Sequence, residues 1–455
     1  MHIHILGIGG TLMGSIAQLA RAQGHKITGS DNVLYEPMQS QLKRAGIDIQ
    51  LPYQDNSIPS AADLIVLGNA GLGRGNPAVE ALLASGKPFQ SGAQFLGQHI
   101  LADKWVIAAA GTHGKTTTAS MIAWLLECAG LNPSYLIGGV PMNFETSARL
   151  TDSPFFVIEA DEYDTSYFDR QSKFLHYRPM TLVINNLEYD HADIFPDLES
   201  IENQFHQLIR RVPALGLIIR HGLDQNIDQL MNRGCWSEQL RFGVVTPSDR
   251  GDLDIAIEPA SGNVEIDGLQ VGTLSWSLAG AHNSANALAA IAAARHVGVP
   301  PALSLDFLEG FRGVKRRLEV INTSNRYVLY DDFAHHPTAI ESTLEAVRAK
   351  VGAAPIYAII EPSSHTMKLG THQPRLIAAC ESADQVFWLE SQPLAFDLAS
   401  LVKPSGHHVA QNPSTLAAAL NTALQSEPST AHIVIMSNGN IDQLKVVLSE
   451  ALPHA

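Results

Sequence analysis

Short apolar segments alternate with longer segments of helical periodicity along the whole chain. Apolar segments that predict strands include His2–Leu6, Trp105–Ala110, Phe155–Ile158, Thr181–Ile184 and Gln385–Leu389. Helical patterns lie between them, for example a pattern of about four turns from Thr116 and another over Asn283–His296. Because strands that alternate with helices are typical of parallel sheets, the sequence predicts an α/β fold.

The alternation falls into three series, and 455 residues are more than one hydrophobic core usually organises. We predict a Rossmann-like N-terminal domain at residues 1–102 and a central domain at residues 103–314. The central domain is expected to be P-loop ATPase-like, with a mostly parallel sheet. A second Rossmann-like domain is predicted at residues 315–455.

The net charge, the cysteines and the N-terminus limit the kinds of binding partner and the cellular compartment that we expect for the chain. The formal net charge of −15 argues against nucleic acid or an anionic membrane as the main partner. The three cysteines are far apart and fit a reduced cytoplasmic setting better than a disulfide framework or a zinc site. The N-terminus has no basic region of a signal peptide, and no segment approaches the length of a membrane span.

The strongest chemical motif is a glycine-rich loop between a predicted strand and a predicted helix. It comprises Gly111, Thr112, His113, Gly114, Lys115, Thr116 and Thr117. Backbone N–H groups at such a junction face an anion, a lysine adds charge for the outer phosphates, and a following hydroxyl can reach Mg²⁺. The loop departs from G-x-x-x-x-G-K-[ST] because Ala109 holds the first glycine position. The alternative is a glycine-rich turn with an incidental lysine.

Polar residues follow two further strands of the same predicted sheet. Glu159 begins an acidic cluster after Phe155–Ile158, and His191 ends a polar segment after Thr181–Ile184. Ligands bind at the carboxyl ends of strands in open α/β sheets, and Mg²⁺ takes oxygen ligands. Glu159 is thus a candidate metal ligand or a solvated strand end. His191 is a candidate metal or phosphate contact or an ordinary polar residue.

Four positions nearer the C-terminus are candidate nucleotide contacts. Asn283 and Asn286, one helical turn apart, could bind an adenine edge or a ribose, and the alternative is N-capping. Arg317 lies in a basic run that is either a solvated face or a phosphate contact across a domain junction. Asp332 follows a strand, where it could face a ribose.

The first glycine turn, which includes Gly7, Gly9 and Gly10, is followed by Asp31 at the end of the second predicted strand. The third glycine of G-x-G-x-x-G would fall at Leu12, so the turn is a weak dinucleotide signal. It remains a reasonable diphosphate site at a helix N-terminus.

Seven motifs occur in the order typical of one family. They read GIGG (7–10), GTHGKTTT (111–118), EADEYD (159–164), NNLEYDH (185–191), GAHNSAN (280–286), RRLE (316–319) and DDFAHHP (331–337). In these motifs, across nearly its whole length, the chain resembles the Mur ligases, which are ATP-dependent amide-forming enzymes of peptidoglycan synthesis. The resemblance implies three domains. The first binds the UDP-sugar, the central one binds ATP, and the C-terminal one helps to bind both ATP and the incoming amine.

The resemblance also implies roles for individual residues. Lys115 and Thr116 look like the phosphate lysine and the Mg²⁺ hydroxyl, and Glu159 and His191 look like metal ligands. Asn283 and Asn286 fall on adenine-binding positions, and Arg317, Asp332 and His335 fall on C-terminal nucleotide contacts. Among these residues, Lys115, Arg317 and His191 are the expected catalytic residues. Gly7, Gly9, Gly10 and Asp31 are expected at the UDP-sugar site.

Within the family, the segments 138–150 and 164–179 resemble those of one branch. The enzymes of that branch join UDP-N-acetylmuramate to the tripeptide L-alanyl-γ-D-glutamyl-meso-diaminopimelate through an acyl phosphate. The alternative is joining UDP-N-acetylmuramate to L-alanine. A cytoplasmic monomer or weak homodimer with ATP and Mg²⁺ as cofactors is expected. The carbamylated lysine of several relatives has no counterpart, since Ser200–Gln207 contains no lysine.

Two departures from the tripeptide branch concern the amine site. Ser363 stands where that branch typically has an arginine, and the glycine-rich turn at 437–440 is shortened.

Two other classes of function account for fewer of these motifs. An NAD-dependent oxidoreductase would rest on the first glycine turn, but it leaves the Lys115 loop unexplained. A P-loop motor or transport ATPase would rest on the Lys115 loop alone.

Overall fold

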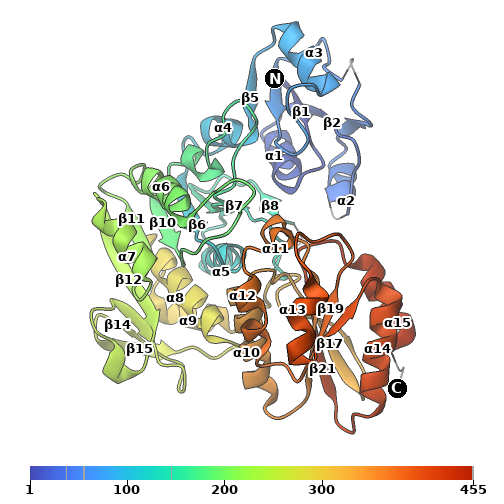
Figure 1. Cartoon of the computed structure of the whole chain (residues 1–455). Helices are drawn as coiled ribbons and strands as arrows, with labels where there is room; N and C mark the ends of the chain where they lie inside the picture. The colour runs from blue at the N-terminus through green and yellow to red at the C-terminus, as the bar shows by residue number, and fades with distance from the viewer. Residues whose placement is uncertain (37, 55–56, 145, 453–455) are drawn as a thin grey trace. The chain divides into compact units, whose positions relative to one another are not determined.

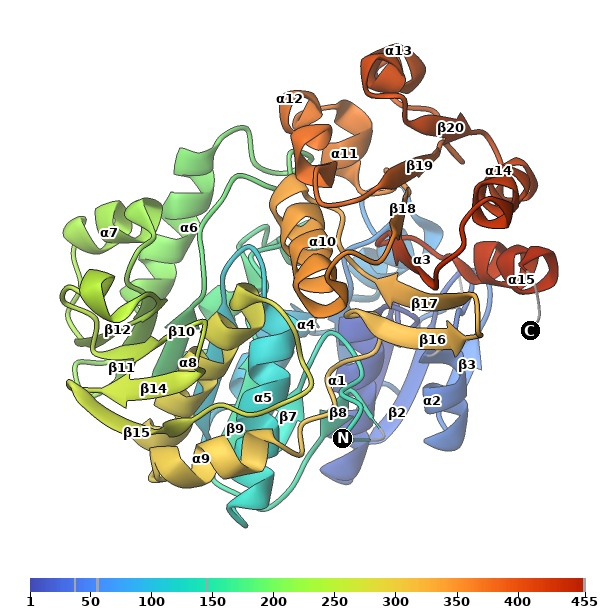
Figure 2. The same cartoon turned by 90° about the horizontal axis from the view of Figure 1, so that it is seen from below.

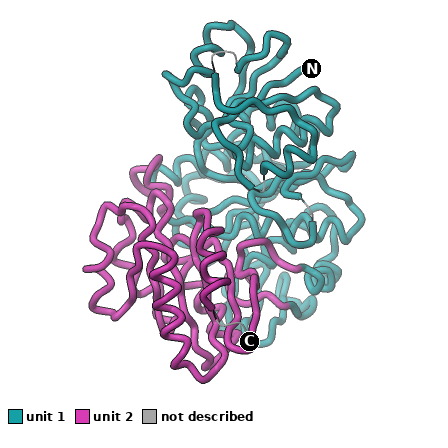
Figure 3. The backbone as a smooth tube through the Cα atoms, turned by 90° about the vertical axis from the view of Figure 1, so that its right-hand side faces the viewer, with its two compact units in different colours: residues 1–188, 199–276, 285–311 teal, residues 189–198, 277–284, 312–455 magenta. Residues whose placement is uncertain are grey.

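The computed structural model describes residues 1–36, 38–54, 57–144 and 146–452 and divides into two compact units. Unit 1 comprises residues 1–188, 199–276 and 285–311, and unit 2 comprises residues 189–198, 277–284 and 312–455. Figure 3 shows the two units in different colours. The predicted domain boundaries at residues 102 and 314 stay a prediction.

Unit 1 begins with a five-stranded parallel sheet in the order β3-β2-β1-β4-β5 (Figure 1). Its strands are β1 (His2–Leu6), β2 (Lys26–Ser30), β3 (Asp48–Gln50), β4 (Leu64–Leu67) and β5 (Phe89–Ser91). Its helices are α1 (Thr11–Ala22), α2 (Met38–Arg44), α3 (Pro77–Ser85) and α4 (Gly92–Phe95), which continues as a π-helical turn over Leu96–Ile100. Parallel strands covered by helices are buried on both faces, and β4 is accordingly buried throughout.

The second sheet of unit 1 has ten strands in the order β15-β14-β13-β12-β11-β10-β6-β9-β7-β8. The strands are β6 (Trp105–Ala110), β7 (Ser134–Leu136), β8 (Ala148–Arg149), β9 (Phe155–Glu159), β10 (Thr181–Ile184), β11 (Leu217–His221), β12 (Glu238–Val244), β13 (Ile255–Ile257), β14 (Asn263–Ile266) and β15 (Leu269–Thr273). The central strands pair in parallel, whereas β8, β14 and β15 pair antiparallel at the two edges. The predicted mostly parallel sheet is therefore confirmed.

Helices α5 (Lys115–Cys128), α6 (Leu198–Ile209), α7 (Gln225–Asn232), α8 (Ala281–His296) and α9 (Pro301–Leu308) belong mainly to this second layer. Helix α5 contacts β6 and β9 and buries Met121, Ile122 and Leu125. Its first residue, Lys115, belongs to the glycine-rich loop after β6. The strand–loop–helix junction predicted at Lys115 is thus formed.

Unit 2 contains a six-stranded sheet in the order β16-β17-β21-β18-β19-β20. Its strands are β16 (Glu319–Thr323), β17 (Tyr327–Asp332), β18 (Ile356–Ile360), β19 (Gln385–Leu389), β20 (His408–Ala410) and β21 (Ala431–Met436), and only β16 is antiparallel to its neighbour. Helices α10 (Pro337–Val351), α11 (His365–Leu369), α12 (Gln373–Leu376) and α13 (Leu398–Val402) belong to one face, and α14 (Pro413–Gln425) and α15 (Asp442–Ala451) to the other (Figure 2).

Each face of this sheet has its own apolar core. Ile340 and Leu344 of α10 pack with Trp388 on one face, and Leu420 of α14 and Leu448 of α15 pack on the other. Both layers together give the Rossmann-like arrangement that the sequence predicted. Among the described residues, no helix is both long enough and apolar enough to cross a membrane.

Candidate active site

The glycine-rich loop after β6 requires glycine at two positions. Gly111 has φ of 127° and Gly114 has φ of 80°, a region that side chains rarely adopt. A Cβ on Gly114 would lie 2.5 Å from Oδ1 of Asn286 and 2.8 Å from Nδ2 of Asn185. The loop therefore packs closely on its neighbours, and its backbone turns into the N-terminus of α5 as an anion-binding loop does.

Two asparagines after β10 hold the loop in place. The N–H of His113 donates to Oδ1 of Asn186 at 2.7 Å, and Nδ2 of Asn185 donates to Oγ1 of Thr118 at 2.9 Å. The sequence predicts a polar segment here, but no signal in it points to a function for these two asparagines. They fix the backbone of the loop and are positioning residues.

Lys115 lies at the start of α5 with its ammonium group buried. Its Nζ donates to the carbonyl oxygens of Gly111 and Thr112 at 2.8 and 3.2 Å and lies 2.9 Å from Oε2 of Glu162. Burial alone lowers the pKa of Lys115, but nearby carboxylates, chiefly Glu162, outweigh burial and raise the pKa. The ammonium group is therefore charged and held beside the loop.

Thr116 and Glu159, the two predicted metal ligands of unit 1, lie together. Oγ1 of Thr116 donates to Oε1 of Glu159 at 3.0 Å, and the second carboxylate oxygen accepts from the N–H of Gly138 at 2.7 Å. Burial raises the pKa of the Glu159 carboxyl, and Lys115 opposes that shift. One hydroxyl and one carboxylate beside a phosphate loop fit the few protein oxygen ligands that Mg²⁺ takes.

The acidic cluster after β9 continues into a hairpin, which we define as residues Asp161–Lys173. An isolated β-bridge between Asp164 and Ser172 joins its two arms, and Lys173 pairs with Asp161 at 2.9 Å. The hairpin contacts the first sheet of unit 1, where Nδ2 of Asn69 donates to Oδ1 of Asp164 at 2.7 Å. Oγ of Ser166 also donates to the carbonyl oxygen of Leu67 at the end of β4.

The two candidate adenine contacts belong to different units. Asn283 lies in unit 2 and donates from Nδ2 to the carbonyl oxygen of Ala279 at 2.7 Å. Asn286 lies in unit 1, where its Oδ1 accepts from Oγ1 of Thr118 at 3.1 Å. Each asparagine thus has a local hydrogen bond, and their adenine-binding role stays a prediction.

Arg317, Asp332 and His335 lie together in unit 2. The Asp332 carboxylate accepts from the N–H groups of Leu318 at 2.7 Å and Ala334 at 2.8 Å, so it ties two loops together. Burial raises its pKa, and Arg317 opposes that shift. The Arg317 guanidinium lies 5.1 Å from the ring centroid of Phe333, and Nδ1 of His335 lies 2.9 Å from the carbonyl oxygen of the same residue.

His191 lies in unit 2, within the segment 189–198 that follows β10 in sequence. It has φ of 57°, and its N–H donates to Oδ1 of Asp190 at 2.7 Å. The neighbouring Ala192 N–H donates to Oγ1 of Thr366 at 3.1 Å, which ties the segment to α11. The role of His191 as a metal ligand stays a prediction.

The glycine turn after β1 is closed by Asp31. Its Oδ2 accepts from the N–H of Gly9 at 2.7 Å, and its Oδ1 lies 3.3 Å from the hydroxyl of Tyr53. A Cβ on Gly9 would lie 2.8 Å from the Asp31 carboxylate, and Gly7 has φ of 81°. The carboxylate therefore positions the turn, and the N–H of Gly10 donates to the carbonyl oxygen of Gly7.

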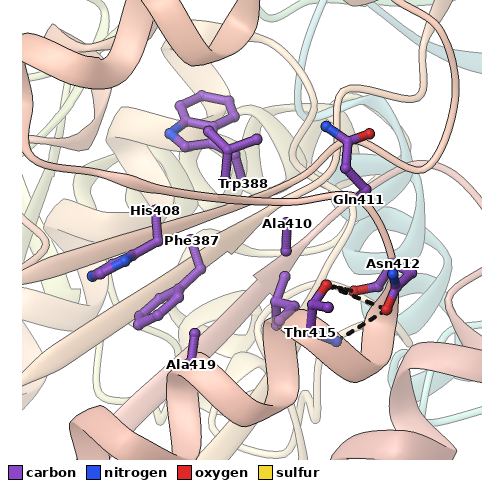
Figure 4. A pocket seen from close by; sticks show the side chains of 10 residues that line it. Phe387, Trp388, His408, Ala410, Gln411, Asn412, Thr415 and Ala419 are labelled. Carbon is purple, nitrogen blue, oxygen red and sulfur yellow. Dashed lines mark hydrogen bonds between the residues drawn. The ribbon is translucent and has the colours of Figure 1, made fainter.

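A cavity of about 280 Å³ lies in unit 2 between β19, β20 and α14 (Figure 4). The rings of Phe387 and His408 stack there with centroids 4.9 Å apart. None of the residues predicted at the active site lines this cavity.

Family models match most of the chain. The model described as "Mur ligase family, catalytic domain" matches residues 2–104, "Mur ligase middle domain" matches residues 109–294, and "Mur ligase, glutamate ligase domain" matches residues 316–439.

Individual relatives match over most or nearly all of the chain. The UDP-N-acetylmuramate--L-alanyl-gamma-D-glutamyl-meso-2,6-diaminoheptandioate ligase of Escherichia coli is 47% identical over 99% of this chain and 98% of its own. A UDP-N-acetylmuramate--L-alanine ligase from Caldanaerobacter subterraneus is 33% identical over 80% of this chain and 77% of its own. A crystal structure of a murein peptide ligase from Psychrobacter arcticus has 40% identity and a TM-score of 0.76, covering 99% and 98% of the two chains. The chain belongs to the Mur ligase family.

Proposed function

We propose that this chain is an ATP-dependent ligase that joins the lactyl carboxylate of UDP-N-acetylmuramate to the α-amine of L-alanyl-γ-D-glutamyl-meso-diaminopimelate. The observation that carries the proposal is 47% identity, over 99% of the chain, to a ligase named for this tripeptide. The buried Lys115 beside a helix N-terminus supplies a site for the ATP phosphates that the reaction needs.

The reaction proceeds in two steps. The muramate carboxylate attacks the γ-phosphate of ATP, which forms an acyl phosphate and releases ADP. The peptide amine then attacks the activated carbonyl, and phosphate leaves from the tetrahedral intermediate. Phosphoryl transfer needs positioning and charge stabilisation above all, and Lys115 and Arg317 are the cations suited to that role.

Mg²⁺ would be held by Thr116 and Glu159, with His191 as a further ligand, and would neutralise charge on the phosphate oxygens. Support comes from the 3.0 Å contact between the Thr116 hydroxyl and the Glu159 carboxylate. Asn283 and Asn286 would bind adenine, and Asp332 and His335 would support the nucleotide from unit 2. Gly7, Gly9 and Gly10, held by Asp31, would bind the diphosphate of the UDP-sugar.

The test is ADP release with UDP-N-acetylmuramate and either the tripeptide or L-alanine. We expect rapid release with the tripeptide and little with L-alanine. The opposite preference would assign the chain to L-alanine ligation instead. ATP hydrolysis that ignores both acceptor and amine would contradict ligation altogether.

A further inference from the structure

All three donors of the Lys115 ammonium group are in use. An ammonium group carries three N–H groups and no acceptor. Two of them donate to the carbonyl oxygens of Gly111 and Thr112, at 2.8 and 3.2 Å, and the third donates to Oε2 of Glu162 at 2.9 Å. A phosphate oxygen that binds Nζ of Lys115 must therefore take the place of one of these three acceptors.

The carboxylate is the acceptor that can be exchanged. The two carbonyl groups belong to the backbone of the glycine-rich loop, which Asn186 holds at two points. The N–H of Thr112 donates to the carbonyl oxygen of Asn186 at 3.2 Å, and the N–H of His113 donates to its Oδ1 at 2.7 Å. Glu162 lies in the hairpin and reaches the ammonium group through a side chain with rotatable bonds. A rotation of that side chain releases one donor while the backbone of the loop stays in place.

The charges around Lys115 make sharing with a phosphate costly. Only 1% of the Glu162 side chain is exposed, so water screens its charge poorly. Glu159 and Asp161 also interact electrostatically with Lys115, so its surroundings are already acidic. Asp161 is paired with Lys173 at 2.9 Å, and Glu162 is paired with Lys115. The phosphates of ATP bring further negative charge to this point, and the repulsion favours departure of the Glu162 carboxylate.

We propose that Glu162 competes with the outer phosphates of ATP for the third donor of Lys115 and so sets the affinity of the chain for nucleotide. The inference rests on the proposed function, which assigns those phosphates to Lys115. Glu162 is then a positioning residue, because its carboxylate keeps the ammonium group charged and beside the loop. The same ion pair has to break before a phosphate oxygen takes its place, and ATP binding is weaker by that amount.

A role of Glu162 as a metal ligand would have the opposite effect on binding. Carboxylates are also ligands of Mg²⁺, and Glu159 already has that expected role. Loss of a metal ligand weakens the binding of ATP with Mg²⁺, whereas loss of a competing anion tightens the binding of ATP. The sign of the change in a Glu162 variant therefore decides between the two roles.

The experiment measures dissociation constants of AMP, ADP and a non-hydrolysable ATP analogue for the full chain by titration calorimetry, with Mg²⁺ and with EDTA. Glu162→Gln keeps the size of the side chain and removes its charge. We expect the dissociation constant of the ATP analogue to fall by about tenfold, as for one hydrogen bond to a charged group, whether or not Mg²⁺ is present. The constant for AMP, which lacks the outer phosphates, should be unchanged.

A matched control comes from the same hairpin. Asp169 is also buried, with 5% of its side chain exposed, but its carboxylate contacts His176 at 2.8 Å. Asp169→Asn should leave all three dissociation constants unchanged. An unchanged or higher dissociation constant for the ATP analogue in Glu162→Gln would overturn the inference.

A second measurement uses the unmodified chain and does not depend on how a variant folds. A crystal structure with the ATP analogue should show Nζ of Lys115 in contact with a phosphate oxygen and beyond hydrogen-bonding reach of Glu162. An ion pair that persists while Nζ contacts the phosphates would overturn the inference.

The outcomes separate the inference from the proposed phosphate site. Lys115→Met should weaken binding of the ATP analogue. If it does not, the phosphates bind elsewhere, and the proposed site fails together with the inference. If Lys115→Met weakens binding but Glu162→Gln does not tighten it, the phosphate site stands and only the competition is removed.

Discussion

Lys115 and Glu162 form a buried ion pair, with Nζ 2.9 Å from Oε2 and side-chain exposures of 11% and 1%. Glu162 thus occupies a position beside the ammonium group that is expected to bind phosphate. Lys115→Ala should lower kcat for ADP formation by at least about 100-fold, the cost of losing one charge-stabilising donor. Steady-state ADP release measures this change. Lys173→Ala, which removes a more exposed cation of the hairpin, serves as the control, and near-normal turnover in Lys115→Ala would contradict the assignment.

The contact between Thr116 and Glu159 predicts a change in metal dependence. Thr116→Val and Glu159→Gln should each raise the Mg²⁺ concentration for half-maximal activity, because each removes an oxygen ligand or its charge. A Mg²⁺ titration at saturating ATP measures the shift. Glu127→Gln alters the opposite end of α5 and should leave the titration unchanged. Unaltered Mg²⁺ dependence in both site variants would place the metal elsewhere.

Asp31 should act on UDP-sugar binding and not on ATP binding. Its carboxylate holds the N–H of Gly9, so Asp31→Ala frees the turn that is expected to face the diphosphate. We expect KM for UDP-N-acetylmuramate to rise about tenfold, as for the loss of one charged hydrogen bond, with KM for ATP unchanged. Glu80→Gln, an exposed change in the same layer, is the control. A rise in KM for ATP alone would refute this role.

His4 predicts a pH dependence of stability. Its ring nitrogens lie 2.8 Å from Oγ1 of Thr28 and 2.9 Å from Oγ of Ser30, and burial lowers its pKa from 6.5 to about 4. Between these values the unfolded chain binds a proton that the folded chain does not. The contribution of His4 is therefore present above pH 6.5 and is lost as the pH falls toward 4, by at most about 3 kcal/mol.

Urea unfolding at pH 7.0 and 5.0 checks the His4 prediction. His4→Gln should show a smaller loss of unfolding free energy between the two pH values than the unmodified chain. His25→Gln, a substitution of a more exposed histidine of the same layer, controls for the general effect of losing an imidazole. An identical pH dependence in His4→Gln would contradict the prediction.

The expected nucleotide contacts belong to both compact units, with Lys115 and Asn286 in unit 1 and Asn283, Arg317 and Asp332 in unit 2. One nucleotide bound by both sets should draw the units together. Small-angle scattering should show a smaller radius of gyration with a non-hydrolysable ATP analogue plus UDP-N-acetylmuramate. A profile unchanged by both ligands would argue against closure.

The strands of the interior were predictable because their apolar runs are unambiguous. β1, β6, β10 and β19 have the predicted bounds, whereas β11 (Leu217–His221) was not predicted. The short strands β3 and β20 were also missed, since three residues carry too little pattern. Helix starts differ by one or two residues, as at Ala281, because capping geometry decides them.

The glycine-rich loop could be identified from the sequence because its residues are consecutive. The residues that contact it could not be identified in that way. The pairing of Lys115 with Glu162 joins residues 47 positions apart. Such contacts depend on the order of strands in the sheet, which one sequence does not reveal. The carboxylates of Asp31 and Asp332 were expected to face ligands, yet each also accepts backbone N–H groups of its own loops.

The hairpin Asp161–Lys173 has a consequence for how the substrates communicate. Glu162, which holds Lys115, and Asp164, which holds Asn69, are separated by Tyr163 alone. Two residues of extended chain span about 7 Å, so little slack remains between the edge of the first sheet and the phosphate loop. A UDP-sugar that shifts this edge by a fraction of an ångström should therefore move the lysine through two hydrogen-bonded contacts and the short chain between them. Amino-acid changes near Asn69 should appear in enzyme assays as altered ATP kinetics, although Asn69 lies outside the phosphate loop.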